Sequence, residues 1–454
     1  MKVAVVGSGI AGLGAAWALD RRHEVTLFEA ESRLGGHANT VDVVQGDRSL
    51  AVDTGFIVYN ELAYPNLTRL FAALDVATER SDMSFSVSLD SGRLEYRGNA
   101  TGLFVQKRNL LSPRFWSMLR DLLRFYREAP GAMREAEAVD LSLGELLAQG
   151  GYGEAFTRDH LLPMGSAIWS APIGEMLAFP AQSFIQFCEN HGLLLLKGRP
   201  QWRTVTGGSR RYVERIGQSL DGRIRLSSPV VALRRAPEGA YLRTAGCEEE
   251  HFDQVVLACH ADQALRILGA DASARETAVL GAFRYEKNIA VLHQDRALMP
   301  RRRGAWASWN YTSGDFAAPP AADGHDGQTV SVTYWMNRLQ NIDRRHPLFV
   351  TLNPQREPRA DLILRSVLYD HPLFDAEALR AQKALPDIQG QARTWFCGAY
   401  CGYGFHEDGL QAGLGVAAAL RSPAPWAQEV VPRSPAATAV VPAAVAAGLR
   451  GTTS

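Results

Sequence analysis

The chain contains 454 residues, and a length of about 100–200 residues per domain predicts more than one structural unit. Hydrophobic residues make up 46% and charged residues 21%, a balance typical of globular proteins that excludes a wholly disordered chain. Lysine plus arginine and aspartate plus glutamate each total 48, so the formal net charge is zero. A dedicated nucleic-acid binder carries a basic excess to pair with phosphates, and we therefore expect no nucleic-acid partner.

The cysteines and the apolar runs limit the cellular compartment. Five cysteines, an odd number spread over a long chain, do not form the pattern of a secreted disulfide framework. Cys397 and Cys401 lie four residues apart without a second Cys or His pair at zinc spacing, so we expect no metal site. The chain has no run of about 18 apolar residues that would span a membrane. Its first residues, MKVAVVGSGIAG, read as a structural strand, and we expect a cytoplasmic protein.

The first 28 residues have the pattern of a βαβ unit. Residues 2–6 (KVAVV) form an apolar, β-branched run that glycines follow directly. Residues 15–19 are then apolar at helical spacing, and residues 24–28 (EVTLF) predict a second strand. This order predicts a parallel sheet covered by helices.

The remaining elements alternate in type along the chain. Residues 76–200 carry long helical patterns, such as that of residues 110–135, whereas residues 223–258 return to strand character. A mixed segment follows, with strand-like runs at 288–293 and 329–335, and a helical pattern over residues 409–420 completes the ordered part. Residues 422–454 are rich in Ala, Pro, Ser and Thr without periodicity, which predicts a disordered tail.

Nucleotide-type βα segments thus occur at the start, the middle and the end of the chain. We expect them to form one discontinuous domain, with the intervening segments inserted as a second, mixed α+β domain and a ligand between the two. The predicted boundaries are 1–75, 200–265 and 385–421 for the first domain, and 76–199 and 266–384 for the second.

A glycine-rich loop after the first strand predicts a dinucleotide site. Gly7 permits a tight turn, Gly9 lets the backbone approach a pyrophosphate, and Gly12 lets the helix pack on the strand. The N-terminus of the following helix offers free N–H groups to phosphates. Glu29 ends the second strand, where an acidic side chain accepts hydrogen bonds from ribose hydroxyls. The predicted contacts in the loop are Gly7, Gly9, Ile10, Ala11 and Gly12.

The residues after Glu29 point to FAD instead of NAD. Residues 33–37 read R-L-G-G-H, in which an arginine would neutralise the pyrophosphate and the double glycine would let the backbone pass close to a flat ring. A plain NAD site does not need this extension. Residues 29–36 (EAESRLGG) resemble the flavin-containing amine oxidase and phytoene desaturase superfamily. The predicted contacts here are Arg33, Gly35, Gly36 and His37.

The resemblance extends to other segments and implies the fold. In this superfamily a strand like that after Ser228 runs beside the adenine end of FAD, and residues 396–413 are similar to its last flavin motif, a glycine-rich loop leading into a helix. A positive helix end stabilises negative charge on reduced flavin. The resemblance implies an α/β fold with a discontinuous Rossmann-type FAD-binding domain, an inserted mixed α+β substrate domain and non-covalent FAD. It adds the contacts Gly55, Phe56, Val230, Gly398, Phe405, His406 and Gly409.

Four phrases narrow the resemblance to a bacterial subgroup of predicted NAD/FAD-binding oxidoreductases. They are DTGFIVYN (53–60), LPMGSAIWS (162–170), TVTGGSRRYV (204–213) and VVLACHADQAL (255–265). Relatives of that subgroup tend to be encoded beside cyclopropane-fatty-acid-synthase-like methyltransferases, and some act as lipid desaturases. The resemblance therefore implies a methyltransferase as a partner.

The chain also departs from the superfamily. Gly398 is followed by Ala399 and Tyr400 instead of Asp or Thr-Glu, which removes one usual cofactor contact. The cysteine loop that tethers flavin in monoamine oxidases is not matched. Those enzymes present two tyrosines before the flavin, and at the better-defined of the two positions this chain has Phe405, so the pair that polarises an amine is not evident.

Four residues are candidates for acid–base chemistry, and none is assigned as the catalytic base. His406 and Glu407 lie in the flavin loop; His406 is either a loop residue whose backbone contacts flavin or a base. His160 precedes the LPMGSAIWS phrase and is either structural or catalytic. Lys287 either holds a water near flavin N5, as a lysine does in several amine oxidases, or lies on the surface.

The expected function is FAD-dependent desaturation of a fatty-acyl chain by hydride transfer to flavin N5. The acyl chain would be carried on a phospholipid, either unbranched or methyl-branched. Residues 110–126 combine Leu, Phe, Trp and Met with arginines, a pattern of a helix in a membrane interface or of an ordinary core-facing helix. The first interpretation predicts peripheral contact with the inner face of the membrane. The alternatives are a flavin amine oxidase, which converts an amine to an imine, and a flavin-binding accessory protein without turnover.

Overall fold

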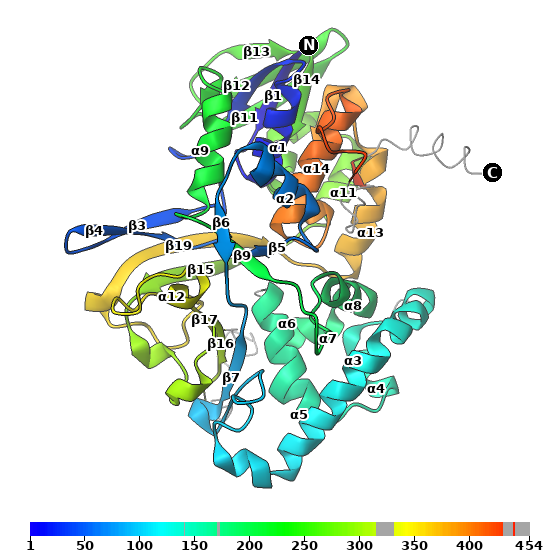
Figure 1. Ribbon diagram of the computed structural model, residues 1–454. Helices are drawn as coiled ribbons and strands as arrows, with labels where there is room; N and C mark the ends of the chain where they lie inside the picture. The colour runs from blue at the N-terminus through cyan, green and yellow to red at the C-terminus, as the bar shows by residue number, and fades with distance from the viewer. Residues whose placement is uncertain (140, 170–172, 315–330, 430–438, 441–454) are drawn as a thin grey trace.

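The computed structural model describes residues 1–139, 141–169, 173–314, 331–429 and 439–440. Figure 1 shows a layer of sheet and helices that holds the N-terminus at one end of the molecule, and a second sheet beside a group of helices at the other end. The chain passes between the two ends several times, as the alternating colours show.

A five-stranded parallel sheet lies at the N-terminal end, in the order β10-β2-β1-β14-β20. Residues 3–6 are almost completely buried, as expected for a parallel strand that helices cover on both faces. The sheet draws its strands from the start, the middle and the end of the chain, as the βα pattern predicts. The strands are β1 (Lys2–Val6), β2 (Glu24–Phe28), β10 (Ile224–Arg225), β14 (Gln254–Leu257) and β20 (Thr394–Phe396).

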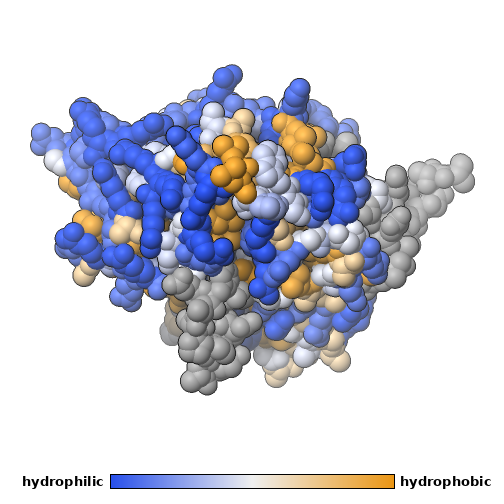
Figure 2. Space-filling view, turned by 90° about the horizontal axis from the view of Figure 1, so that it is seen from below, coloured by the Kyte–Doolittle hydropathy of each residue, from blue (hydrophilic) through white to orange (hydrophobic). Residues whose placement is uncertain are grey.

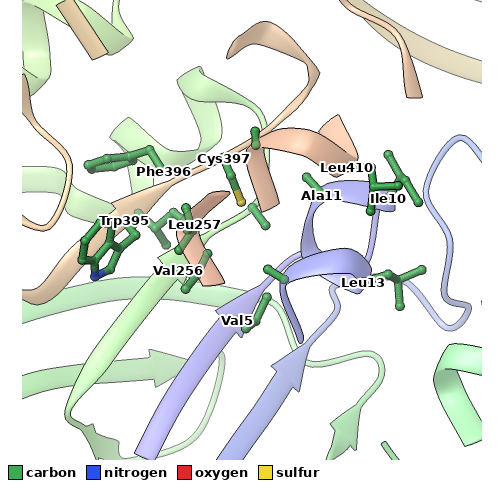
Figure 3. Close-up of a cluster of buried hydrophobic side chains, with 14 of the residues drawn as sticks. Val5, Ile10, Ala11, Leu13, Val256, Leu257, Trp395, Phe396, Cys397 and Leu410 are labelled. Carbon is green, nitrogen blue, oxygen red and sulfur yellow. The ribbon is translucent and has the colours of Figure 1, made fainter. Parts of the chain in front are cut away.

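Two helices, α1 (Ile10–Leu19) and α14 (His406–Ala419), pack against each other and against this sheet. Figure 3 shows the apolar side chains between them, with Leu13 and Leu410 from the helices and Val5 and Val256 from the strands. A Cβ atom on Gly12 would lie 1.9 Å from the Gly7 carbonyl oxygen, so only glycine lets α1 come this close to the preceding loop. The first and last helices of the ordered chain therefore meet above the sheet.

A seven-stranded sheet forms the second layer, in the order β19-β15-β18-β17-β16-β7-β8. Its neighbours are antiparallel except for the parallel pair β16 and β7. The strands are β7 (Phe85–Leu89), β8 (Leu94–Arg97), β15 (Tyr285–His293), β16 (Trp309–Thr312), β17 (Ser331–Trp335), β18 (Phe349–Leu352) and β19 (Ile363–Pro372).

A group of helices lies beside this sheet (Figure 1). The predicted helix over residues 110–135 is present as α3, which begins at Pro113, after a 3₁₀ turn over Lys107–Leu111. In the described part of the chain no helix is both long and apolar enough to cross a bilayer. The helices are α3 (Pro113–Val139), α4 (Leu143–Gln149), α5 (Glu154–Phe156), a π-helical turn (Thr157–Leu161), α6 (Leu162–Trp169), α7 (Ile173–Ala178) and α8 (Ala181–Asn190).

Three small sheets and several further helices are also present in the described chain. The sheets contain β3 (Thr40–Gln45) with β4 (Arg48–Asp53); β5 (Tyr59–Asn60), β9 (Trp202–Val205) and β6 (Thr78–Arg80); and β11 (Val230–Ala236), β12 (Gly239–Thr244) and β13 (Glu249–Phe252). The helices are α2 (Pro65–Ala73), α9 (Arg210–Ser219), α10 (Ala261–Leu268), α11 (Ala274–Leu280), α12 (Met336–Leu339) and α13 (Ala376–Ala384).

The tail expected to be disordered from residue 422 is ordered over residues 422–429. Trp426 is buried, stacks on Trp17 at 5.5 Å between ring centroids, and donates a hydrogen bond from Nε1 to Asn66 at 3.1 Å. The Ser422 hydroxyl donates to the Ala18 carbonyl at 2.6 Å. The prediction was wrong here because one indole ring supplies enough apolar surface to hold a segment that is otherwise poor in large side chains. Residues 430–438 and 441–454 lie outside the described residues.

Candidate active site

A cavity of about 1910 Å³ runs from the loop after β1 to the helices α3 and α6. Its wall includes the ends of β1 and β2, the start of β11, the loop before α14 and the seven-stranded sheet. Pockets for one drug-sized ligand measure roughly 300–1,000 Å³. The cavity therefore has room for a dinucleotide and a second ligand.

The loop between β1 and α1 has the geometry of a phosphate cradle. Gly7 has φ of +100°, a left-handed conformation that side chains disfavour. Gly9 lines the cavity, and no atom lies within 4 Å of the position its Cβ would take, so open space faces the backbone there. Gly12 lies behind the loop in the helix contact and does not line the cavity, whereas Ile10 and Ala11 do. The first N–H groups of α1 have no partner within the helix and face this space.

Glu29 is held in place by the same loop. Its Oε2 accepts hydrogen bonds from the Ser8 backbone N–H, at 2.8 Å, and from the Ser8 hydroxyl. Its Oε1 accepts from the Glu31 N–H at 2.9 Å. A carboxylate has about four lone-pair sites, so Glu29 retains capacity for one further donor, such as a ribose hydroxyl. Glu29 lines the cavity, where the prediction requires it.

The R-L-G-G-H segment lies next to this loop, and only some of its residues line the cavity. Arg33 lines the cavity, forms an ion pair with Glu31 at 3.1 Å and donates to the Gly36 carbonyl at 2.9 Å. Gly36 and His37 also line it, but Gly35 does not, because its N–H donates to the Ser8 carbonyl in the wall. The structure thus gives Gly35 a framework role instead of the expected cofactor contact.

The strand expected near the adenine end of FAD is β11. Val230 lines the cavity, and the preceding Ser228 donates its N–H to the Glu29 carbonyl at 2.8 Å. Gly55 and Phe56 line the cavity from the segment after β4. The sequence phrases from distant parts of the chain therefore meet at one site.

The glycine-rich loop before α14 closes the other side. Gly398 and Phe405 line the cavity, and Phe405 stacks on Phe187 at 4.6 Å between ring centroids. The Tyr400 hydroxyl and the Asp370 Oδ1 belong to cavity-lining residues, and neither has a hydrogen-bond partner among the described residues. Buried polar atoms are rarely left unpaired, so these two fit a bound group with polar edges, such as FAD.

His406, the first residue of α14, lies face to face with Phe56 at 3.8 Å between centroids. Its Nε2 lies 3.0 Å from the Tyr212 hydroxyl. Burial lowers the pKa of His406 to about 3, so the imidazole is neutral at physiological pH. The structure places His406 on the cavity wall as a rigid, neutral ring.

Glu407 and Gly409 face away from the cavity. Glu407 accepts hydrogen bonds from the Asn66 N–H and side-chain amide, both at 2.8 Å, and from the Leu67 N–H at 3.0 Å. It therefore caps α2 and is not placed to act as a base. A Cβ on Gly409 would lie 3.0 Å from Ile10, which gives this glycine a role in helix packing, not in cofactor contact.

The other two catalytic candidates lie in different environments. Lys287 is exposed on β15 and does not line the cavity, so the structure supports the surface alternative and not a water held near flavin. His160 is 6% exposed and lines the cavity; its Nδ1 lies 2.9 Å from the Tyr96 hydroxyl, and its Nε2 has no partner among the described residues. Burial lowers the pKa of His160 to about 4.

Sequence reasoning missed a second group of rings near the dinucleotide loop. His37 stacks on Tyr369 at 4.7 Å and lies 5.3 Å from His371, while His260 stacks on Tyr285 at 4.4 Å. Burial and the neighbouring histidines hold the pKa of His37 well below its usual value. His371, near the end of β19, lies in no recognised segment, and His260, which precedes α10, lies in the phrase over residues 255–265 but was given no role.

The cysteines near the flavin loop are not exposed to the cavity. Cys397 and Cys401 are completely buried, and burial raises the pKa of the Cys401 thiol to about 12. Non-covalent binding of FAD stays a prediction. Among the described residues, no group of three or more His, Cys, Asp or Glu side chains is placed to hold a metal ion.

Comparisons with known proteins agree with this geometry. The family of flavin containing amine oxidoreductases matches residues 10–279. A Mycobacterium tuberculosis protein named flavin-containing monoamine oxidase AofH is 27% identical over 242 residues, which are 52% of this chain and 52% of that protein. The carotenoid phi-ring synthase of Chlorobaculum tepidum is 30% identical over 133 residues, 29% of this chain and 20% of that protein. The chain thus spans about half or less of the length of these curated relatives.

Solved structures show the same fold over nearly the whole chain. Putrescine oxidase bound to putrescine matches with a TM-score of 0.67 and 16% identity. The match covers 93% of this chain and 99% of the putrescine oxidase chain. The CLA-producing fatty acid isomerase from P. acnes has a TM-score of 0.66 and 14% identity, and covers 90% and 96%.

The solved structures confirm the expected fold class. The family match confirms FAD as the cofactor and FAD-dependent oxidoreductase as the enzyme class. The methyltransferase partner and the membrane contact stay predictions. The family match covers more than half of the chain and includes the helix that follows the glycine-rich loop. The chain belongs to the flavin-containing amine oxidoreductase family.

Proposed function

We propose that the protein desaturates a long fatty-acyl chain carried on a phospholipid. The observation that carries this proposal is the continuity of the cavity, which runs from the dinucleotide loop into an arm lined mainly by apolar side chains. Long acyl chains need such an arm, and small amines do not. The arm is lined by Leu119, Leu122, Leu123, Tyr126, Met164, Ala167, Ile168, Trp169, Leu193 and Leu196, with Trp116 at its edge.

The arm opens beside large apolar side chains that are exposed. Trp116 and Leu123 line the cavity and are 49% and 51% exposed, and Leu196 is 64% exposed. On the face seen from below, Figure 2 shows hydrophobic side chains within a mostly hydrophilic surface. Exposed apolar groups around a cavity opening favour contact with a lipid surface, where a substrate chain would leave the bilayer.

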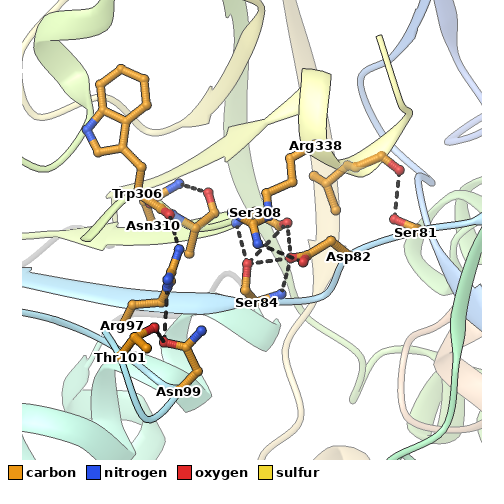
Figure 4. A network of polar contacts seen from close by, with 12 residues as sticks. Ser81, Asp82, Ser84, Arg97, Asn99, Thr101, Trp306, Ser308, Asn310 and Arg338 are labelled. Carbon is orange, nitrogen blue, oxygen red and sulfur yellow. Dashed lines mark hydrogen bonds and ion pairs between the residues drawn. The ribbon is translucent and has the colours of Figure 1, made fainter. Parts of the chain in front are cut away.

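The charges near the arm do not favour a cationic amine. Asp82 lines the cavity but is held by Ser84, Ser308 and Arg338 at 2.5–2.8 Å (Figure 4). Burial acts to raise the pKa of Asp82, but these hydrogen bonds outweigh it and lower the pKa to about 2. Its charge is therefore already paired with Arg338. Phe405, which stacks on Phe187, provides an aromatic wall without a hydroxyl.

The reaction removes two hydrogens from adjacent carbons, one as hydride and one as a proton, and forms a C=C bond. Bound FAD supplies the acceptor for the hydride. The chain's own residues hold the acyl chain straight along α6, exclude water, and offer neutral imidazoles. Both His406 and His160 line the cavity in the neutral form, because burial lowers the pKa of each. Because the low pKa of His406 opposes protonation of its ring, the proton would leave to a water at this wall of the cavity.

Lipid mass spectrometry of cells with and without the gene tests this proposal. We expect specific acyl chains, including methyl-branched ones, to be two hydrogens lighter when the gene is present. Anaerobic mixing of the purified protein with the affected lipid should bleach the flavin. Unchanged lipids together with peroxide release from amines would show an amine oxidase. Failure of every lipid and amine to bleach the flavin would support an accessory protein without turnover.

A further inference from the structure

One face of α3 forms part of the cavity opening and combines apolar and cationic side chains. Trp116, Arg120 and Leu123 follow one another at helical spacing, so they lie on the same face, and all three line the cavity. The Arg120 side chain is 74% exposed. The cavity wall at this position is therefore also molecular surface.

A second exposed arginine lines the same cavity from the segment after α8. Arg199 is exposed and lines the cavity together with Leu196. Its guanidinium donates to the backbone carbonyls of Leu195, at 2.6 Å, and Leu193, at 3.4 Å. These bonds fix the side chain without neutralising its charge, and no carboxylate of the described residues forms an ion pair with it.

Arg120 is also only weakly neutralised. Its contact with Asp121 is 3.4 Å long, and Asp121 also accepts the Gly153 N–H at 2.9 Å and lies 3.8 Å from Arg124. A guanidinium has five donors in a fork that matches phosphate oxygens. Two such groups at the entrance of an apolar arm fit a ligand with an anionic head and an apolar tail.

We propose that Arg120 and Arg199 bind the head-group phosphate of an anionic phospholipid in a bilayer while one acyl chain enters the arm. This inference rests on the proposed function and adds the head-group class and the residues that select it. The bilayer is favoured over free fatty acid because Trp116, Leu123 and Leu196 are exposed around the same opening. A dissolved carboxylate would need the cations but not an exposed apolar rim.

Flavin reduction by three substrates with the same acyl chains in one neutral detergent tests the assignment. The substrates are phosphatidylglycerol, diacylglycerol and free fatty acid. For the wild-type holoenzyme we expect the lowest KM with phosphatidylglycerol. Arg120→Gln and Arg199→Gln should each raise that KM about fivefold, the factor of about 1 kcal/mol per arginine at an anionic lipid surface, with kcat unchanged at saturation. The double variant should treat phosphatidylglycerol and diacylglycerol alike.

Arg127→Gln is the matched control, because Arg127 lies on α3, is 77% exposed and does not line the cavity. Equal KM values for phosphatidylglycerol and diacylglycerol in the wild type would overturn the inference, and so would an Arg127→Gln effect as large as that of the double variant. A lower KM for free fatty acid would assign the arginines to a carboxylate. If none of the three substrates reduces the flavin, the proposed function fails. Cosedimentation with phosphatidylglycerol vesicles then tests the head-group site separately. Equal binding of the wild type and the double variant to these vesicles would overturn the assignment of the two arginines.

Discussion

Substitutions of Glu407 test whether this residue stabilises the start of α2 or acts as a catalytic base. Its carboxylate is 6% exposed and accepts three hydrogen bonds from Asn66 and Leu67 at the start of α2. Glu407→Ala leaves two backbone N–H groups unpaired, each costing about 1–3 kcal/mol, so we expect a loss of about 3–5 kcal/mol in the free energy of unfolding. Glu407→Gln keeps one acceptor oxygen and should lose about 1–2 kcal/mol.

The pH dependence of stability gives this prediction a second readout. Burial raises the pKa of Glu407 from 4.5 to about 8, against the opposing effect of the hydrogen bonds from α2. Between these values the folded protein holds a proton that the unfolded chain has released, so stability falls as pH rises from 4.5 to 8. At about 1.4 kcal/mol per pKa unit, the full effect is about 5 kcal/mol. Glu407→Gln cannot titrate and should lack this slope.

Urea unfolding of the FAD-loaded protein at several pH values measures both effects, with flavin reduction followed in parallel. We expect both variants to retain FAD and to reduce it at the wild-type rate once folded. A Glu407→Gln variant with wild-type stability and no flavin reduction would show that Glu407 is the base. A variant with the wild-type pH slope would refute the buried, protonated carboxyl.

Three further outcomes follow from the geometry. Burial lowers the pKa of His191 to about 4, so stability is lost as pH falls from 6.5 to 4, and His191→Phe should flatten the pH dependence of the free energy of unfolding, measured with urea, by about 1.4 kcal/mol per pH unit at most. Gly9→Asp places a carboxylate where phosphate must lie and should give a folded protein without FAD, as judged by circular dichroism and absorbance. Trp116→Ser combined with Leu123→Ser should weaken cosedimentation with vesicles, whereas Val44→Ser, 74% exposed on β3, should not.

The sequence predicted the dinucleotide half of the molecule well because its signals are local. A tight turn, a close helix contact and an acidic strand end each need particular residues at fixed spacing, as Gly7, Gly12 and Glu29 illustrate. The same reasoning assigned Gly35 and Gly409 to the cofactor, but these glycines let neighbouring backbones approach each other. A motif marks where glycine is required without telling whether a ligand or the protein occupies the adjacent space.

The substrate half was harder to predict because its residues come together only in the folded chain. Glu407 seemed a candidate base from its place in the flavin loop, yet the side chain of the second helical residue turns to α2 instead. His371 lies in no motif, and its proximity to His37 depends on the course of β19 in the folded chain. The order of residues 422–429 was missed because the composition of the whole tail hides the effect of one aromatic side chain, Trp426, which stacks on Trp17.

The helix α6 and the π-helical turn before it line the cavity at increasing distance from the flavin loop. Trp169, at the end of α6, contacts Phe405 of the flavin loop with 6.3 Å between centroids. His160 lies nine residues earlier, in the π-helical turn, and α6 alone is about 12 Å long at the helical rise of 1.5 Å per residue. A small amine at the flavin would contact Trp169 and leave His160 unused, whereas a long acyl chain that reaches the opening at Trp116 would pass both. The distance between these two lining residues therefore favours a chain-like substrate over a compact one.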